Sequence, residues 1–249
     1  MEMMSILSEV DLQTLVVFDI DYTLYRPTTN LGTPEWIYYL ATQEMNKGLS
    51  QIEAFQKCYP LWLKTQHIIN LELMDPNIPE LLTFIERMSA GFIALTARRP
   101  ETAKVTTLQL NKLGLKLDKT EVSNLPVSFD FKNPVLFEKG ILFGHELNDK
   151  GDVFVDWFKK VQLALSEENK ITKVIFIDDV ETNVLSMAKA ANSLNLTYKG
   201  YYYSVANAFK EKFNPMLAEK EAYILRQDYS EAETKAHLQS ILFEMEPNN

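Results

Sequence analysis

Short apolar runs recur along the chain and are separated by longer segments with helical periodicity. Leu15–Ile20, Phe92–Leu95 and Val174–Ile177 are such runs, and Gly200–Val205 is strand-like in composition. A run that is apolar throughout is typical of a strand buried on both faces, as in the centre of a parallel sheet. The alternation of these strands with helices therefore predicts an α/β fold with a doubly wound parallel sheet.

Capping residues mark several of the predicted helices. Thr33 is the expected N-cap of a helix that begins at Pro34 and ends at Gly48, and Ser50 is expected to cap the next helix. Pro60 is expected to interrupt or kink that second helix after about Cys58, because proline removes a backbone donor. Further helices are predicted at about 61–71, 76–88, 101–113, 152–165 and 181–193.

The segment 116–147 has a less regular pattern. Alternation over Val127–Phe131 and the apolar run Gly140–Gly144 predict short strands, which can pair as a hairpin.

A helical insertion separates the first buried strand from the rest of the predicted sheet. We expect residues 1–30 and 75–216 to form one core, residues 31–74 a small inserted helical domain, and residues 217–249 a helical C-terminal extension. The insertion is rich in aromatic residues, and packing between helices accounts for most of them. Because long insertions beside an active strand often act as lids, a lid that contacts substrate is the sharper interpretation.

Composition, charge and the N-terminal sequence argue against several classes of protein. The 249 residues carry a net charge of −9, unlike the basic surface of a nucleic-acid binder, and the single Cys58 excludes an intrachain disulfide. The N-terminus lacks the basic start and apolar run of a secretory signal, and no window reaches transmembrane length. We therefore expect a soluble, cytoplasmic protein that engages neither nucleic acid nor a membrane.

Polar side chains follow the three buried strands where each one ends. Asp19 and Asp21 follow the first strand, Thr96 the second, and Asp178 and Asp179 the third. Positions two apart in an extended segment point the same way, so Asp19 and Asp21 are expected to face one side. Carboxylates at this edge of a sheet suit Mg²⁺, and one of them can attack phosphorus. Thr96 can alternatively serve as a helix N-cap.

Basic residues near these strand ends have alternative interpretations. Lys150 would add an ammonium group to these carboxylates from the start of a helix. Lys139 is the alternative candidate for this lysine, but Gly151 and the amphipathic helix after it favour Lys150. Arg98 and Arg99 can bind a phosphate or carboxylate, or can be a solvated helix start.

Four segments resemble, in this order, the motifs of the haloacid dehalogenase (HAD) superfamily. The stretch LVVFDIDYTLY (residues 15–25) resembles the first motif, DxDx[TV], and FIALTARRP (92–100) the second. NDKGDVF (148–154) resembles the third and VIFIDDVETNV (174–184) the acidic fourth. The insertion between the first two motifs resembles a C1-type helical cap on a Rossmannoid core. Within the superfamily the chain is similar to bacterial proteins of unassigned substrate.

The resemblance implies a Mg²⁺-dependent phosphohydrolase that cleaves a small-molecule phosphate ester through an aspartyl-phosphate. Asp19 would be the nucleophile and a metal ligand. Asp21 would be the general acid and base, and its backbone carbonyl would also bind Mg²⁺. Asp179 would be a direct metal ligand and Asp178 an outer-shell partner.

The same resemblance implies phosphate contacts for Thr96, Ala97, Arg98 and Lys150, with Lys150 also holding Asp19. Asn183 stands where many relatives have an acidic residue and would lie in the second shell of the metal. A phosphomutase or phosphotransferase would use the same intermediate, and a protein that only binds phosphate or a partner is a third class. The complete acidic and basic set favours an enzyme, because clustered buried carboxylates are costly.

Overall fold

A six-stranded, mostly parallel sheet forms the centre of the larger part of the protein. The computed structural model describes residues 3–226, and its strand order is β5-β6-β4-β1-β7-β8, with β5 antiparallel and all other neighbours parallel. The strands are β1 (Thr14–Phe18), β4 (Gly91–Thr96), β5 (Leu136–Glu138), β6 (Ile141–Phe143), β7 (Lys173–Asp178) and β8 (Thr197–Tyr202). This arrangement confirms the predicted α/β class with a parallel sheet.

Strand β1 is central, which explains why it is apolar throughout. It pairs with β4 on one side and β7 on the other, so that Val16 lies opposite Phe92 and Ile175. All five residues of β1 are buried. The parallel register brings the carboxyl ends of β1, β4 and β7 to the same edge of the sheet, where ligands bind in open α/β folds.

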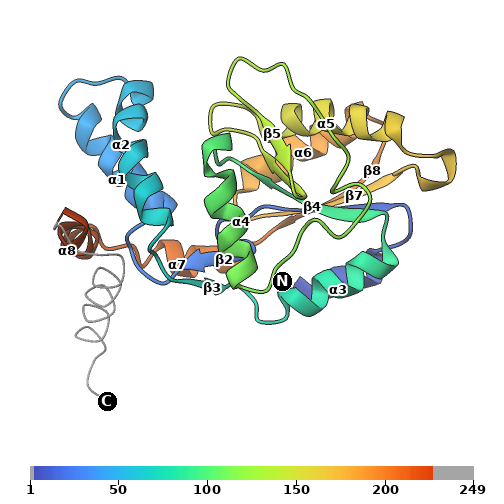
Figure 1. Ribbon diagram of the computed structural model, residues 1–249, viewed down its shortest axis with the longest axis horizontal. Helices are drawn as coiled ribbons and strands as arrows, with labels where there is room; N and C mark the ends of the chain where they lie inside the picture. The colour runs from blue at the N-terminus through green and yellow to red at the C-terminus, as the bar shows by residue number, and fades with distance from the viewer. Residues whose placement is uncertain (1–2, 227–249) are drawn as a thin grey trace. The chain divides into compact units, whose positions relative to one another are not determined.

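Helices cover both faces of the sheet (Figure 1). Helices α5 (Lys150–Ala164) and α6 (Glu181–Ser193) lie over one face, where Trp157 and Phe158 pack with Leu15 and Val17. Helix α3 (Ile78–Met88) covers the other face beside the short 3-10 helix η1 (Met3–Glu9). The remaining elements of this part are η2 (Pro100–Thr102), α4 (Ala103–Lys112), η3 (Glu167–Asn169) and η4 (Ser204–Ala206).

The chain divides into two compact units. The first comprises Met1–Tyr25 and Leu73–Asn207, and the second comprises Arg26–Glu72 with the described residues from Ala208 onward. The inserted segment therefore starts slightly before the expected residue 31, and it is grouped with α8 (Pro215–Arg226) rather than standing alone. The other elements at or within the second unit are β2 (Tyr25–Pro27), α1 (Pro34–Met45), α2 (Gln51–Gln66), β3 (Leu71–Leu73) and α7 (Asn207–Lys210).

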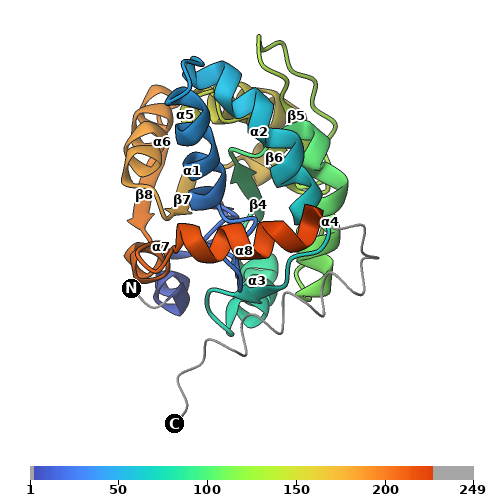
Figure 2. The ribbon, with the colours of Figure 1, turned by 90° about the vertical axis from the view of Figure 1, so that its left-hand side faces the viewer.

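Aromatic side chains of the second unit form its own core. Trp36 of α1 and Tyr59 and Trp62 of α2 are buried together with Ala218 and Ala222 of α8. Figure 2 shows α1, α2 and α8 as neighbouring helices. Helix packing thus explains most of these aromatic residues, as the sequence pattern indicated.

Most predicted helices and strands are present, with Thr33 and Ser50 as side-chain N-caps of α1 and α2. Of the two effects expected of Pro60, the interruption is wrong, because α2 continues to Gln66. Pro60 and Gln56, whose carbonyl would accept the missing hydrogen bond, are both exposed. Water can satisfy that carbonyl, so the proline is tolerated.

Two strand predictions need correction. Val127–Phe131 is not a strand: Val127, Phe129 and Phe131 pack on the core from an irregular segment, which produces the alternation without a strand partner. The hairpin is instead β5 and β6. The last strand is β8, which ends at Tyr202 rather than Val205. The helical prediction over 217–249 coincides with α8 as far as Arg226, and its remainder lies outside the described residues.

Candidate functional site

Three buried carboxylates meet at the carboxyl edge of the sheet. Asp19 follows β1, where its backbone N–H still donates to the carbonyl of Ile177 at 2.9 Å. Asp178 ends β7 and Asp179 follows it. Each of the three carboxylates offers an oxygen within 4.8 Å of the others, and all three residues are buried. The apolar strands therefore carry acidic groups into a space that water barely reaches.

Lys150 lies among these carboxylates. Its ammonium group donates hydrogen bonds to Asp19 Oδ1 and, at 2.7 Å, to Asp178 Oδ2. Burial alone would lower the pKa of Lys150, but Asp178 and Asp19 outweigh it and raise the pKa above its usual value, so the ammonium stays charged. The structure thus selects Lys150 over Lys139, which is exposed in the turn between β5 and β6.

Asp19 is in an unbalanced electrostatic environment. Burial raises its pKa well above the usual value, Lys150 opposes the shift, and Asp178, Asp179 and Asp21 add to it. Lys150 pairs with Asp19 and Asp178, and the Asp179 carboxylate lies in the same cluster, so these acidic oxygens together are suited to hold a cation.

Asp178 is held in place from several sides. Its Oδ1 accepts from the backbone N–H of Val180 at 2.8 Å, and the Asn183 side-chain amide donates to both of its oxygens at 3.0 and 3.1 Å. With Lys150 as a further donor, Asp178 is fully buried and hydrogen bonded. These hydrogen bonds fix the position of Asp178 within the cluster, and Asn183 reaches the cluster through Asp178.

The start of helix α5 fixes the position of Lys150. Asp149 is the N-cap and accepts from the N–H of Asp152 at 3.1 Å, while the Ser186 hydroxyl of α6 donates to Asp149. A Cβ atom on Gly151 would lie 2.5 Å from Ser186 Oγ, so only glycine lets the two helices approach here. Asp149 could have been recognised as an N-cap from sequence, whereas Ser186 carries no such signal.

The Asp19 and Asp21 carboxylates bind different basic residues, although both lie near the carboxyl end of β1. The chain leaves β1 in a tight turn, in which Leu24 N–H donates to Ile20 at 2.9 Å and Tyr22 has a φ of 59°. The two-residue period of a strand no longer applies after the turn begins. The Asp21 carboxylate instead accepts from Arg98 Nε and Nη2, each at 2.8 Å.

Arg98 is anchored by groups that sequence reasoning missed. Its Nη1 donates to Thr106 Oγ1 at 3.0 Å and to Gln109 Oε1 at 2.8 Å, both on α4. The Tyr25 hydroxyl donates to the same Gln109 oxygen at 2.8 Å. The predicted phosphate contact of Arg98 is therefore replaced in this structure by a buried network that ends at Asp21. No short motif links these residues, because Tyr25 and Gln109 alone are 84 positions apart.

Thr96 and Ala97 directly precede Arg98 in the chain. Thr96 ends β4 and is buried, and its Oγ1 accepts from the backbone N–H of Arg98 at 3.1 Å. Ala97 is exposed. The Thr96 hydroxyl can still donate its proton to a ligand, since its hydrogen bond to Arg98 uses it only as an acceptor.

The site combines groups suited to hard anions and hard cations. The carboxylate oxygens of Asp19, Asp178 and Asp179 are the donors that Mg²⁺ prefers. Lys150 and the Thr96 hydroxyl can bind anionic oxygen atoms. The arrangement can therefore bring a carboxylate, a cation and a phosphate together.

Comparison with known proteins identifies relatives in Chlamydia. The chain is 29% identical to a protein of Chlamydia muridarum over 223 residues, covering 90% of this chain and 81% of that one. A protein of Chlamydia trachomatis serovar D matches with the same identity and coverage. One from Chlamydia pneumoniae is 22% identical over 212 residues, covering 82% and 76%. No solved structure gives a significant match.

These relatives correct the expected location of the protein. All three carry the name "Putative outer membrane protein", which contradicts the expectation of a cytoplasmic protein. That expectation came from composition and the N-terminus, which do not encode every route of transport. Within residues 3–226, none of the helices has the length and apolar character needed to cross a membrane.

A family model also matches the chain. Its description is "Protein of unknown function (DUF2608)", and it covers residues 1–234. The match includes both β1 with Asp19 and β7 with Asp178 and Asp179. The chain therefore belongs to the DUF2608 family.

Proposed function

We propose that this protein is a HAD-type phosphohydrolase that cleaves a phosphate monoester through an aspartyl-phosphate. The observation that carries the proposal is the contact of Lys150 with Asp19 and Asp178, beside Asp179. These residues come from three of the four segments that resemble HAD motifs, and they are up to 160 positions apart. A surface cluster of acids would not require a buried ammonium group at its centre.

Each residue has a defined part in the proposed reaction. A carboxylate oxygen of Asp19 attacks phosphorus, forms an acyl-phosphate and breaks the bond to the ester oxygen. Asp21 gives a proton to the departing alkoxide. Water then attacks phosphorus and loses its proton to Asp21, which releases phosphate and regenerates Asp19. Lys150 and Thr96 would bind the phosphoryl oxygens, whose charge is largest in the transition state.

The donor set fits a magnesium ion. Asp19 and Asp179 would hold it directly, with the backbone carbonyl of Asp21 as a further ligand and Asp178 and Asn183 positioning the shell around it. Bound Mg²⁺ would neutralise the excess negative charge of the cluster and of the phosphate.

Asp21 must change partner before it can act. Both of its carboxylate oxygens accept hydrogen bonds from Arg98, so at least one has to be released for proton transfer to a leaving group. This observation also favours a second candidate, a protein that binds a phosphate ester without turning it over. A phosphotransferase would use the same residues and differ only in the acceptor.

We assign the role of a C1-type cap to residues 31–74. The assignment rests on the place of this segment between the first two motifs and on its own aromatic core. A cap of this kind selects the part of the substrate away from the phosphate. The substrate class is accordingly a small phosphate ester.

Hydrolysis of 4-nitrophenyl phosphate tests the proposal. The wild-type protein should release phosphate when Mg²⁺ is present and stop when EDTA is added. Asp19→Asn should be inactive, whereas Asp130→Asn, an exposed aspartate outside the site, should match the wild type. Phosphate binding without turnover in the wild type would support the binding protein instead.

A further inference from the structure

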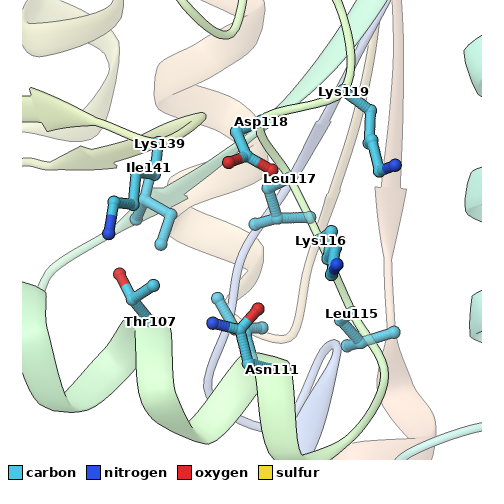
Figure 3. Close-up of a pocket in the computed structure, with 10 residues that line it drawn as sticks. Thr107, Asn111, Leu115, Lys116, Leu117, Asp118, Lys119, Lys139 and Ile141 are labelled. Carbon is cyan, nitrogen blue, oxygen red and sulfur yellow. The ribbon is translucent and has the colours of Figure 1, made fainter.

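A cavity lies away from the acidic cluster. It has a volume of about 430 Å³ and opens between the last turns of α4, the segment after it and the tip of the β5–β6 hairpin (Figure 3). It contains none of the residues assigned above to phosphate or metal. Its lining residues are Thr107, Leu110, Asn111, Leu115, Lys116, Leu117, Asp118, Lys119, Lys139 and Ile141.

Helix α4 separates the two sites. Thr107 and Asn111 line the cavity, whereas Thr106 and Gln109 hold Arg98. Successive residues of a helix are about 100° apart, so these two pairs lie on different faces of α4. A ligand in the cavity would therefore approach α4 from the face that does not hold Arg98.

The cavity is basic although the protein is acidic. Lys116, Lys119 and Lys139 stand at its edge with Asp118 as the single acid, which leaves an excess of two positive charges in a chain of net charge −9. All four residues are exposed. Among residues 3–226, no salt bridge engages any of the three lysines.

Lys139 has an unfavourable backbone conformation. It has a φ of 51° and is followed by Gly140 with a φ of 72°, as in a two-residue type I′ turn. Such a turn favours asparagine, aspartate or glycine at the first position, not lysine. A non-glycine residue at positive φ often marks a functional position, and here the Lys139 side chain extends from the hairpin tip along the cavity (Figure 3).

Contacts between the hairpin tip and the segment before it form the wall of the cavity. A Cβ atom on Gly140 would lie 2.1 Å from the carbonyl oxygen of Leu117, so the hairpin tip is seated directly on the neighbouring segment. Gly140 N–H also donates to Ser123 at 3.0 Å. The Asn124 side chain donates to the carbonyls of Asp118 and Thr120, both at 3.0 Å. A preformed wall spares a ligand the cost of ordering it.

We propose that this cavity binds a phosphorylated ligand that carries at least two negative charges. The three lysines supply the compact, strongly hydrated charges that suit phosphate groups. Thr107 and Asn111 supply neutral donors. Within the described part of the chain the lining includes no aromatic side chain, which favours recognition through the phosphate groups. The ligand is a soluble phosphorylated compound or the headgroup of a phospholipid.

Calorimetry with inorganic pyrophosphate tests the soluble ligand, at low salt and with EDTA present. We expect the triple variant Lys116→Gln, Lys119→Gln, Lys139→Asn to bind at least about tenfold more weakly than the wild type. Lys104→Gln, Lys112→Gln, Lys159→Gln removes the same charge from exposed lysines outside the cavity and should change the affinity less than about twofold. Equal losses in the two triple variants would overturn the proposal.

Sedimentation with vesicles distinguishes the two sources of phosphate. Vesicles of phosphatidylcholine with cardiolipin, whose headgroup carries two phosphate groups, should retain the wild type and not the cavity variant if the ligand is a lipid headgroup. If the wild type binds neither pyrophosphate nor these vesicles, the proposal is overturned. Lys139→Asn alone keeps the test decisive, because asparagine suits the turn and should leave the melting temperature equal or higher while weakening binding.

Discussion

The Arg98 guanidinium donates one hydrogen bond to each carboxylate oxygen of Asp21, from Nε to Oδ2 and from Nη2 to Oδ1, both at 2.8 Å. The two residues are 77 positions apart. Arg98 itself is 5% exposed and is anchored by Thr106 and Gln109. The residue proposed as general acid and base is thus oriented by a side chain that a sequence motif would assign to phosphate.

Arg98→Lys should affect substrates according to their leaving groups. Lysine cannot donate two parallel hydrogen bonds, so Asp21 would lose its fixed orientation. Turnover of an alkyl phosphate, whose leaving group needs a proton, should fall by about tenfold or more, while that of 4-nitrophenyl phosphate changes less than about threefold.

Arg99→Lys is the matched control, because the neighbouring Arg99 makes a similar paired contact with Glu146. It should leave the ratio of the two rates unchanged. An equal loss on both substrates in Arg98→Lys would remove Asp21 from the acid role.

Asp19→Asn should abolish turnover while the protein stays folded. The amide has nearly the shape of the carboxylate but cannot form an acyl-phosphate. Activity should drop below about 1% of the wild type, as for removal of other catalytic nucleophiles. Phosphate release is the measurement, and circular dichroism verifies the fold. Residual activity above a few per cent in a preparation free of other phosphatases would show that another group is the nucleophile.

Lys150→Met should be strongly destabilising. It leaves Asp19 and Asp178 buried without the ammonium group between them, and breaking a buried pair of this kind costs about 3–5 kcal/mol. Urea unfolding in EDTA measures the change. Lys47→Met is the control: it removes the i,i+3 pair of an exposed lysine with Glu44, worth about 0.2–0.5 kcal/mol. Similar losses in both variants would show that the buried pair contributes little.

Mg²⁺ should stabilise the wild-type protein and EDTA should reverse the effect. A ligand that binds only the folded state adds about 2.7 kcal/mol at one hundred times its dissociation constant. The melting temperature should rise with Mg²⁺ in the wild type but not in Asp179→Asn, which loses a proposed metal ligand. An unchanged melting temperature over millimolar Mg²⁺, together with activity in EDTA, would exclude the proposed metal site.

Glu221 should make stability depend on pH. Burial raises its pKa above the usual value, although its hydrogen bond from the Leu31 N–H, at 2.7 Å, opposes this shift. The folded state therefore binds the proton more tightly than the unfolded state. Stability from this group is greatest below the unfolded pKa, about 4.5, and declines as the pH rises toward the folded pKa.

Glu221→Gln should remove that decline. Its stability relative to the wild type should increase between about pH 4.5 and 7, as measured by urea unfolding at several pH values. Glu219→Gln, an exposed glutamate on the same helix, should not show this trend. A difference between Glu221→Gln and the wild type that stays constant with pH would contradict the assignment.

Local pattern predicted the scaffold of the site well. The apolar runs that became β1, β4 and β7 predicted a parallel sheet, and a parallel sheet places Asp19, Thr96 and Asp178 at one edge. Buried strands have strong hydrophobic signals because both faces need apolar residues. Alternation of apolar and polar residues can arise from a paired strand or from an irregular segment that packs on the core. At Val127–Phe131 it predicted a strand wrongly, because this segment packs on the core without pairing with a strand.

The sequence by itself determined the α/β class, the central strands and the clustering of acidic residues at their ends, since these follow from hydrophobic periodicity and parallel register. Only the tertiary structure decided that Lys150 and not Lys139 joins Asp19, and that Asp21 turns to Arg98. Such contacts depend on how a turn redirects a side chain and on which helix brings a distant residue near. Sequence spacing does not encode either, because a long-range contact depends on the packing of the whole unit.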